Sequence, residues 1–128
     1  MIYLDSSVVL ASVFQEPRSP PVTLWDEELT SSRLLGYEVW VRLNAYGLVH
    51  SHGDRAKARL DRVNFVELSE IALARALKPS PVALRTLDAL HLATMDFLRK
   101  NGEPIELASY DGRLVAAAQG VGIPITAL

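Results

Sequence analysis

The sequence contains no cysteine among its 128 residues. This absence excludes disulfide bonds, thiolate metal sites and cysteine nucleophiles, and it suits a reducing compartment. Long apolar runs are missing too: no stretch approaches the roughly 18 apolar residues of a membrane span. Asp5 also interrupts the first apolar run too early for a signal peptide. We therefore expect a cytoplasmic protein that does not associate with membranes.

The chain also lacks an excess of charge of either sign, because 13 basic and 15 acidic side chains give a formal net charge of −2. Without an overall basic field, a nucleic acid would have to bind through local patches. Apolar residues make up 49% of the chain, which is enough for one substantial core, and the length fits one domain. No repeat or linker divides the chain, so we expect a single domain over residues 1–128.

Short apolar runs alternate with helical patterns along the whole chain. This alternation is typical of an α/β fold with a mostly parallel sheet, here of four to five strands. Strands are predicted at 2–4, 29–34, 64–68, 105–108 and, as an edge strand containing Pro124, at 123–126. Helices are predicted at 8–14, 20–28 and 35–50, from a cap at Asp54, from a cap at Ser69 to Leu77, and at 82–100 and 111–119.

Two acids follow predicted strands at the edge where parallel sheets bind ligands. Asp5 comes directly after the first strand, and Asp111 follows the fourth by a few residues. Each has an alternative role, because aspartate at a helix start is a common N-cap. Ser6 or Ser7 offers another cap for the first helix, which would leave Asp5 free. If the strands are parallel, both acids face the same crevice.

Asp88 lies on the stripe of the long predicted helix that also carries Leu92 and Met95. If this stripe is buried, an unpaired carboxylate there costs several kcal/mol unless a cation balances it. The alternatives to an active-site acid are an ion pair with Arg85 or a hydrogen bond to His91. We expect His91 itself to pack or to form a hydrogen bond rather than to transfer protons.

Glu38 is a fourth candidate, and its alternative role is an exposed ion pair with Arg42, one turn further along. Carboxylates that converge repel one another and take up protons unless a cation balances them. Mg²⁺ or Mn²⁺ suits such a site, because hard cations prefer carboxylate and water oxygens. Such an ion can activate water and stabilise the charge that develops on a phosphodiester. The four acids together therefore suggest phosphodiester hydrolysis.

Four segments carry a resemblance to a known family: Ile-Tyr-Leu-Asp-Ser-Ser at 2–7, Tyr-Glu-Val-Trp at 37–40, Arg-Thr-Leu-Asp-Ala-Leu-His-Leu-Ala at 85–93 and Ser-Tyr-Asp-Gly-Arg-Leu at 109–114. The chain resembles the PIN-domain nucleases over essentially its whole length. Its compact size resembles the VapC-type toxins of type II toxin–antitoxin pairs. The resemblance implies a three-layer α/β/α PIN-like domain.

The resemblance also implies a function and a site. The family's chemistry is endonucleolytic cleavage of RNA by metal-activated water, with Mg²⁺ as the cofactor and Mn²⁺ as a possible substitute. The implied partners are a cognate VapB-type antitoxin, which blocks the site, and a second copy of the chain in a homodimer. Ser6 would contact metal-bound water or phosphate, and Arg113 would hold Asp111 or a phosphate. The catalytic and metal-binding acids would be Asp5, Glu38, Asp88 and Asp111.

Two other functions compete with this interpretation. An acid-lined α/β phosphoacceptor or phosphatase domain would use Asp5 as a nucleophile, but such a phosphatase has a second aspartate two residues later, where Ser7 stands. A non-catalytic RNA- or protein-binding PIN-like module would use the acids only as helix caps.

A stripe of basic residues is the remaining candidate for nucleic-acid binding. Arg55, Arg59 and Arg62 share one face of a predicted helix and would suit RNA phosphates. The alternative is an ordinary solvated face, paired with Asp54 and Asp61.

Overall fold

The computed structural model describes residues 1–128, and a parallel sheet of four strands forms its middle layer. The strand order is β3-β2-β1-β4, and every neighbouring pair is parallel. Every residue of the two central strands is buried, as expected when helices cover both faces of a parallel sheet. The strands are β1 (Ile2–Leu4), β2 (Leu29–Ser32), β3 (Val63–Val66) and β4 (Glu106–Ala108).

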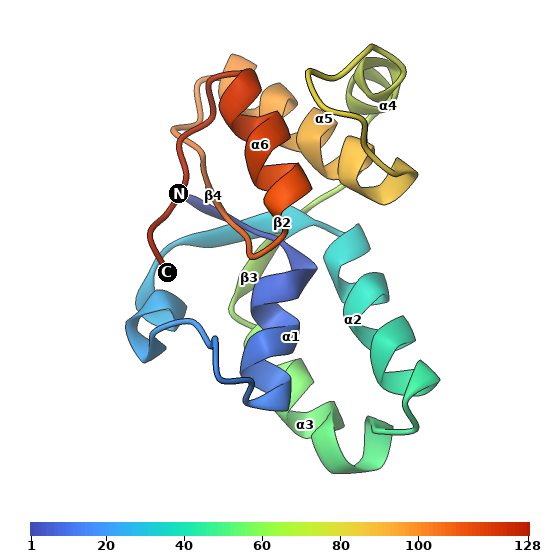
Figure 1. Cartoon of the computed structure of the whole chain (residues 1–128), viewed down its shortest axis with the longest axis vertical. Coiled ribbons are helices and arrows are strands. Elements are labelled where there is room, and N and C mark those ends of the chain that lie inside the picture. Colours follow the sequence, from blue (N-terminus) through green and yellow to red (C-terminus); the bar gives the residue numbers. More distant parts are fainter.

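Six α-helices cover the sheet in two groups. In Figure 1, α1, α2 and α3 lie on one side, and α4, α5 and α6 lie on the other. The predicted three-layer α/β/α fold is therefore confirmed. None of these helices combines the length and the apolar character that crossing a membrane would need. The helices are α1 (Ser6–Phe14), α2 (Leu34–Ala45), α3 (Val49–Leu60), α4 (Glu70–Ala76), α5 (Thr86–Lys100) and α6 (Gly112–Gly120), with a 3₁₀ helix η1 (Val22–Asp26) before β2.

The two faces of β1 contribute to two different cores. Ile2 and Leu4 pack into the cluster that α1, α2 and α3 share. Tyr3 lies between them in sequence and packs with Met95 and Leu114 on the α5–α6 side. Successive strand residues point to opposite faces of a sheet. This alternation sends the Tyr3 side chain, which is fully buried, towards α5.

The boundary between the second and third long helices differs from the prediction. The first turn of chain after α2 contains Gly47 at a φ of +65°, a conformation that glycine adopts without strain, and α3 begins at Val49. The predicted helix start at Asp54 is therefore wrong. Gly53 lies inside α3, where a Cβ atom would come within 3.3 Å of Trp40. Its lack of a side chain allows α2 and α3 to pack closely.

Three further boundaries differ from the prediction. Segment 20–28 contains a 3₁₀ helix rather than an α-helix. The longest helix begins at Thr86 instead of residue 82, because Arg85 before it is extended. The predicted fifth strand is reduced to a single parallel bridge between Ile125 and Leu107. Pro124 has no N–H to donate to a ladder, and its carbonyl accepts from the Leu107 N–H at 2.9 Å.

The predicted arginine stripe, with Arg55 and Arg59 on α3 and Arg62 just after it, contacts the protein itself. Arg55 donates to the Val13 carbonyl at 2.7 Å, and Arg59 donates to the Ser12 hydroxyl at 3.1 Å. Arg62 donates to a backbone carbonyl of η1 at 2.9 Å. These bonds join α3 to α1 and η1. The structure thus shows a packing role that neither the RNA-phosphate nor the solvated-face expectation described.

Candidate active site

The four acids predicted from the sequence line one cleft beyond the carboxyl ends of the central strands. Asp5 directly follows β1, Asp111 lies three residues after the end of β4, and the other two acids project from α2 and the first turn of α5. Residues far apart in the chain meet here because parallel strands end at the same edge of a sheet. The cleft-lining polar residues include Asp5, Ser6, Ser7, Glu38, Asp88 and Asp111.

Asp5 is both the N-cap of α1 and part of the cleft wall. Its side chain is buried, and its Oδ2 accepts from the Ser7 hydroxyl at 2.6 Å, the Ser7 N–H at 3.4 Å and the Ser109 hydroxyl at 2.9 Å. Asp5 therefore caps α1 itself, and the alternative cap by Ser6 or Ser7 is not used. Oδ1 has no hydrogen-bond donor from the protein, so capping leaves one oxygen of Asp5 available to a ligand.

Asp111 repeats this arrangement at α6. Its Oδ1 accepts from the N–H groups of Arg113 at 2.9 Å and Leu114 at 3.4 Å, whereas Oδ2 has no donor. Ser109, whose hydroxyl donates to Asp5, also accepts from the Asp111 N–H at 2.9 Å. Sequence reasoning missed Ser109. Its place two residues before Asp111 was the available signal, because serine there can cap the turn.

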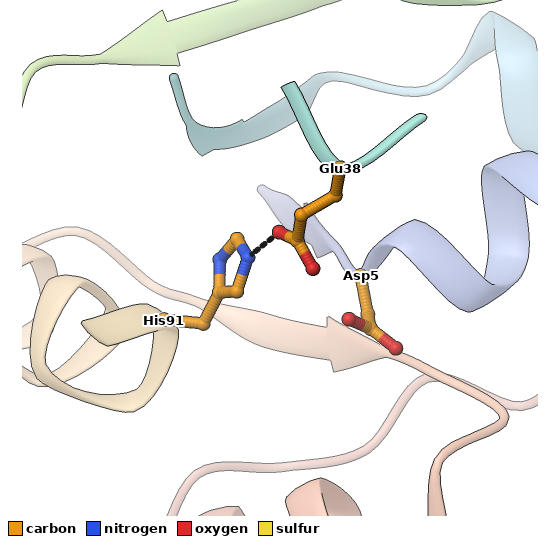
Figure 2. A group of neighbouring side chains, drawn as sticks. All are labelled: Asp5, Glu38 and His91. Atoms are coloured by element: carbon orange, nitrogen blue, oxygen red, sulfur yellow. Dashed lines mark hydrogen bonds and ion pairs between the residues drawn. The ribbon is translucent and has the colours of Figure 1, made fainter. Parts of the chain in front are cut away.

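Glu38 points from α2 across the cleft towards α5 (Figure 2). The side chain is 15% exposed and hydrogen-bonds to buried His91, and the alternative ion pair with Arg42 is not formed. One carboxylate oxygen contacts His91 Nε2, and the other accepts from the Ser6 hydroxyl at 3.2 Å. The expectation that His91 forms a nearby hydrogen bond is confirmed, although its partner is Glu38, not Asp88.

Asp88 lies half-buried at the start of α5 and has no ion pair with Arg85. Burial raises the pKa of Asp88, and the negative charges of Asp111 and Asp5 raise this pKa further. A carboxyl group with a raised pKa is one whose ionised form lacks sufficient compensation from the protein. The local electrostatics therefore favour a cation next to Asp88.

The residues present fit a divalent cation. Ligand atoms of Asp5, Glu38 and His91 lie within 4.8 Å of one another, and Figure 2 shows these side chains converging from three elements. The arginines that line the cleft, Arg42 and Arg85, form no ion pair with its acids. A site rich in carboxylate oxygens and poor in protein cations suits a hard divalent ion.

The two predicted substrate-binding residues lie at different places. Ser6 lines the cleft and donates to Glu38, so its hydroxyl proton is already used. Arg113 is exposed and lines an adjoining hollow together with Arg85, Asp88 and Asp111. This hollow is therefore lined by two carboxylates, Asp88 and Asp111, and by two guanidinium groups, Arg85 and Arg113. A polyanion bound beside the acids would also contact these arginines.

Comparison with known proteins gives consistent results. A sequence model of the PIN domain family matches residues 2–120. The chain is 35% identical to Ribonuclease VapC46 of Mycobacterium tuberculosis strain H37Rv over 130 residues, which cover 98% of this chain and 96% of that protein. It is 29% identical to Ribonuclease VapC47 of strain CDC 1551 over 129 residues, with coverage of 95% and 93%.

A solved structure supports the fold independently. A toxin–antitoxin complex from Klebsiella pneumoniae contains a chain that aligns with a TM-score of 0.63 at 20% identity, covering 98% of this chain and 97% of that one. At this identity the match concerns the fold alone. The sequence matches over nearly the full length show that the chain belongs to the PIN domain family and, within it, to the VapC group.

Proposed function

We propose that this chain is a metal-dependent endoribonuclease toxin that cleaves RNA phosphodiester bonds and is inhibited by a cognate VapB-type antitoxin. Residues 1–128 would act as one nuclease domain. The observation that carries the proposal is the meeting of four acids from distant parts of the chain in one cleft, where none of them forms an ion pair with lysine or arginine. The ribonuclease names of the relatives support the choice of RNA.

In this proposal Asp5 and Asp88 are the principal metal ligands, and Glu38 and Asp111 complete the site directly or through water. The oxygens without protein donors, Asp5 Oδ1 and Asp111 Oδ2, are available for that role. A bound Mg²⁺, with Mn²⁺ as a substitute, would activate a water and neutralise the charge that develops on the phosphate. Helix capping holds Asp5 and Asp111 in place, and hydrogen bonds to Ser6 and His91 hold Glu38.

The remaining residues would orient the substrate. Ser6 would keep Glu38 in place and meet water or phosphate at the cleft mouth. Arg113 would bind an RNA phosphate next to Asp111, because guanidinium groups match phosphate geometry. Water then adds to the phosphorus as the P–O3′ bond breaks, which leaves a 5′-phosphate and a 3′-hydroxyl.

The proposed protein partners need apolar contact surface, and the molecule exposes some. Tyr37 and Val41 on α2 are each 66% exposed, and Leu77, which follows α4, is 87% exposed. Grouped exposed apolar side chains are typical of interaction sites. We expect the antitoxin and a second copy of the chain to cover such surfaces. We also expect the protein to act in the cytoplasm, where its RNA substrate is found.

Cleavage of structured RNA in Mg²⁺ buffer tests the proposal. The parent chain should cut RNA internally, lose activity in excess chelator and regain it with Mg²⁺ or Mn²⁺. Asp5→Asn should abolish cleavage and retain the fold, since asparagine is also a good N-cap. The matched control is Asp54→Asn, which removes an exposed acid on α3 outside the cleft and should leave cleavage unchanged.

Two results would count against the proposal. Full activity of the parent chain in chelator would exclude a metal mechanism. Retained Mg²⁺-dependent cleavage in Asp5→Asn would remove this cluster from the catalytic site. Sequencing the RNA ends completes the test, because the proposed chemistry requires 5′-phosphates and 3′-hydroxyls.

A further inference from the structure

A chain of hydrogen bonds leads from the buried middle of the sheet to Glu38. The Tyr3 hydroxyl lies 2.7 Å from His91 Nδ1, and His91 Nε2 contacts a Glu38 carboxylate oxygen. The Ser32 N–H donates to the Tyr3 hydroxyl oxygen at 3.1 Å. Tyr3 and His91 are both fully buried, so no water competes for these bonds. We call Ser32, Tyr3, His91 and Glu38 the buried chain.

One assignment of donors and acceptors runs consistently along the buried chain. Because the Ser32 N–H already donates to the Tyr3 oxygen, the Tyr3 O–H is free to donate to His91 Nδ1. A neutral imidazole that accepts at Nδ1 carries its proton on Nε2, where it donates to Glu38. A tyrosine hydroxyl is ordinarily protonated at neutral pH, so Tyr3 has a proton to donate.

We infer that Tyr3 and His91 are positioning residues, which orient the Glu38 carboxylate at the proposed metal site while His91 stays outside the coordination sphere of the metal. This inference rests on the proposed function. Nothing in the reaction requires Tyr3 or His91 to touch RNA or water. They act by fixing the rotamer of Glu38, whose second oxygen is held by Ser6. Outer hydrogen bonds of this kind orient carboxylate ligands at metal sites.

The competing role for His91 is direct ligation, since its ring, Asp5 and Glu38 have ligand atoms within 4.8 Å of one another. Both ring nitrogens, however, already have partners: Nδ1 faces Tyr3, and Nε2 faces Glu38. Figure 2 shows the ring directed at the Glu38 carboxylate, with Asp5 on the far side of that carboxylate. Ligation through Nε2 would cost the Glu38 contact. The geometry therefore favours the outer position.

The first test needs no metal and no variant. Nitrogen-detected NMR of the metal-free protein, labelled with ¹⁵N in histidine, reports which ring nitrogen of His91 carries the proton. We expect the proton on Nε2 and an accepting Nδ1. A ring protonated on Nδ1 alone would reverse the buried chain and overturn the inference.

The second test uses Mn²⁺ as a spectroscopic probe. Electron spin-echo modulation of the Mn²⁺-loaded protein detects nitrogen bound directly to the ion. We expect no strong nitrogen coupling, because oxygen ligands alone would surround the metal. A coupling that disappears in His91→Gln would identify His91 as a ligand and overturn the outer assignment.

Calorimetric titration with Mn²⁺ then measures the positioning effect. His91→Leu should weaken binding by about 10–100-fold, the usual range for loss of an outer-shell partner. His91→Gln should retain most of the affinity, because its amide N–H can reach Glu38 as Nε2 does. Tyr3→Phe, one bond further away, should weaken binding by no more than about tenfold. Equal losses in His91→Leu and His91→Gln would contradict a hydrogen-bond role.

The double variant separates positioning from mere packing. Since Tyr3 acts through His91, adding Tyr3→Phe to His91→Leu should cause no further loss of Mn²⁺ affinity. The matched control is Thr30→Val, which removes a buried hydroxyl that bonds to the Asn64 carbonyl outside the buried chain. Its affinity should equal that of the parent. Strictly additive losses, or an equal loss in Thr30→Val, would show that the effects are structural.

The outcomes also separate this inference from the proposed function. If the parent chain fails to bind Mn²⁺, the metal-dependent function itself fails. If the parent binds Mn²⁺ and Asp5→Asn does not, but His91→Leu binds as the parent does, only the positioning role is overturned. Circular dichroism of each variant confirms that it is folded before titration.

Discussion

Asp88 and Asp96 lie about two turns apart on α5, yet their surroundings are opposite. Asp96 contacts three basic groups: Arg75 at 3.1 Å, Lys100 at 3.3 Å and Arg99 at 3.5 Å. Asp88 forms no ion pair, and burial together with neighbouring carboxylates raises its pKa. Both side chains are partly buried. The fold thus places basic side chains next to Asp96 and none in ion-pair contact with Asp88.

This contrast separates an acid used for structure from one available to a ligand. Asp96 joins α5 to Arg75 of α4, so its charge is balanced inside the fold. Asp88 faces a cleft where its neighbours have the same sign. A balanced acid gains nothing from an added cation, whereas an unbalanced one does. The predictions below use substitutions at the two positions to test this difference.

The largest expected effect is on cleavage. Asp88→Asn should reduce RNA cleavage by more than about a hundredfold, exceeding the usual loss of an outer-shell partner, because a proposed ligand is removed. Asp96→Asn should remain within about threefold of the parent chain, like changes outside a site. Initial rates at saturating Mg²⁺ measure both. Comparable rates for the two variants would remove the functional distinction between these acids.

The next effect is on stability. Asp96→Asn leaves Arg75, whose side chain is only 20% exposed, without its charged partner. We expect the free energy of unfolding to fall by about 1–3 kcal/mol, as when one partner of a buried hydrogen-bonded pair is lost. Urea unfolding in chelator measures this change. An unchanged midpoint would mean that the ion pairs of Asp96 contribute nothing to the fold.

The smallest expected effect is a gain in stability, in contrast to the loss expected for Asp96→Asn. The pKa of Asp88 is higher in the folded chain than its ordinary value of 3.8, so its ionised form opposes folding. This cost is full above the folded pKa and disappears as the pH falls through that pKa towards 3.8. Metal-free Asp88→Asn should therefore unfold at a slightly higher temperature than the parent at neutral pH.

The pH dependence provides the control for that result. The difference in melting temperature between Asp88→Asn and the parent should shrink on acidification, when the parent's carboxyl becomes neutral. A difference that stays constant, or grows, as the pH falls would show that repulsion at Asp88 is not its cause.

Part of the contrast between these acids is visible in the sequence. Asp96 precedes Arg99 and Lys100 by three and four residues, which is the favourable order for helical ion pairs. Asp88 follows Arg85 instead, and the structure has no ion pair between them. The third partner of Asp96, Arg75, comes from another helix, and spacing along the chain could not identify it.

The caps and the cleft were predictable to different degrees. The sequence predicted that Asp5 and Asp111 either cap helices or face a crevice. The structure shows both at once, because each carboxylate uses one oxygen for its cap. Treating the two roles as alternatives overlooked the second oxygen. Helix boundaries near Gly47 and Gly53 were wrong because the decisive contact, with Trp40, lies between helices.

The sequence by itself determined the alternation of strands and helices, and it placed Asp5 and Asp111 after strands and Asp88 on the helix stripe that carries Leu92 and Met95. Periodicity is a local property, so these features can be read along the chain. Only the tertiary structure decided that Tyr3 bonds to His91, and His91 to Glu38. Those partners come from β1, α5 and α2, and hydrogen bonds between distant segments depend on how the layers pack.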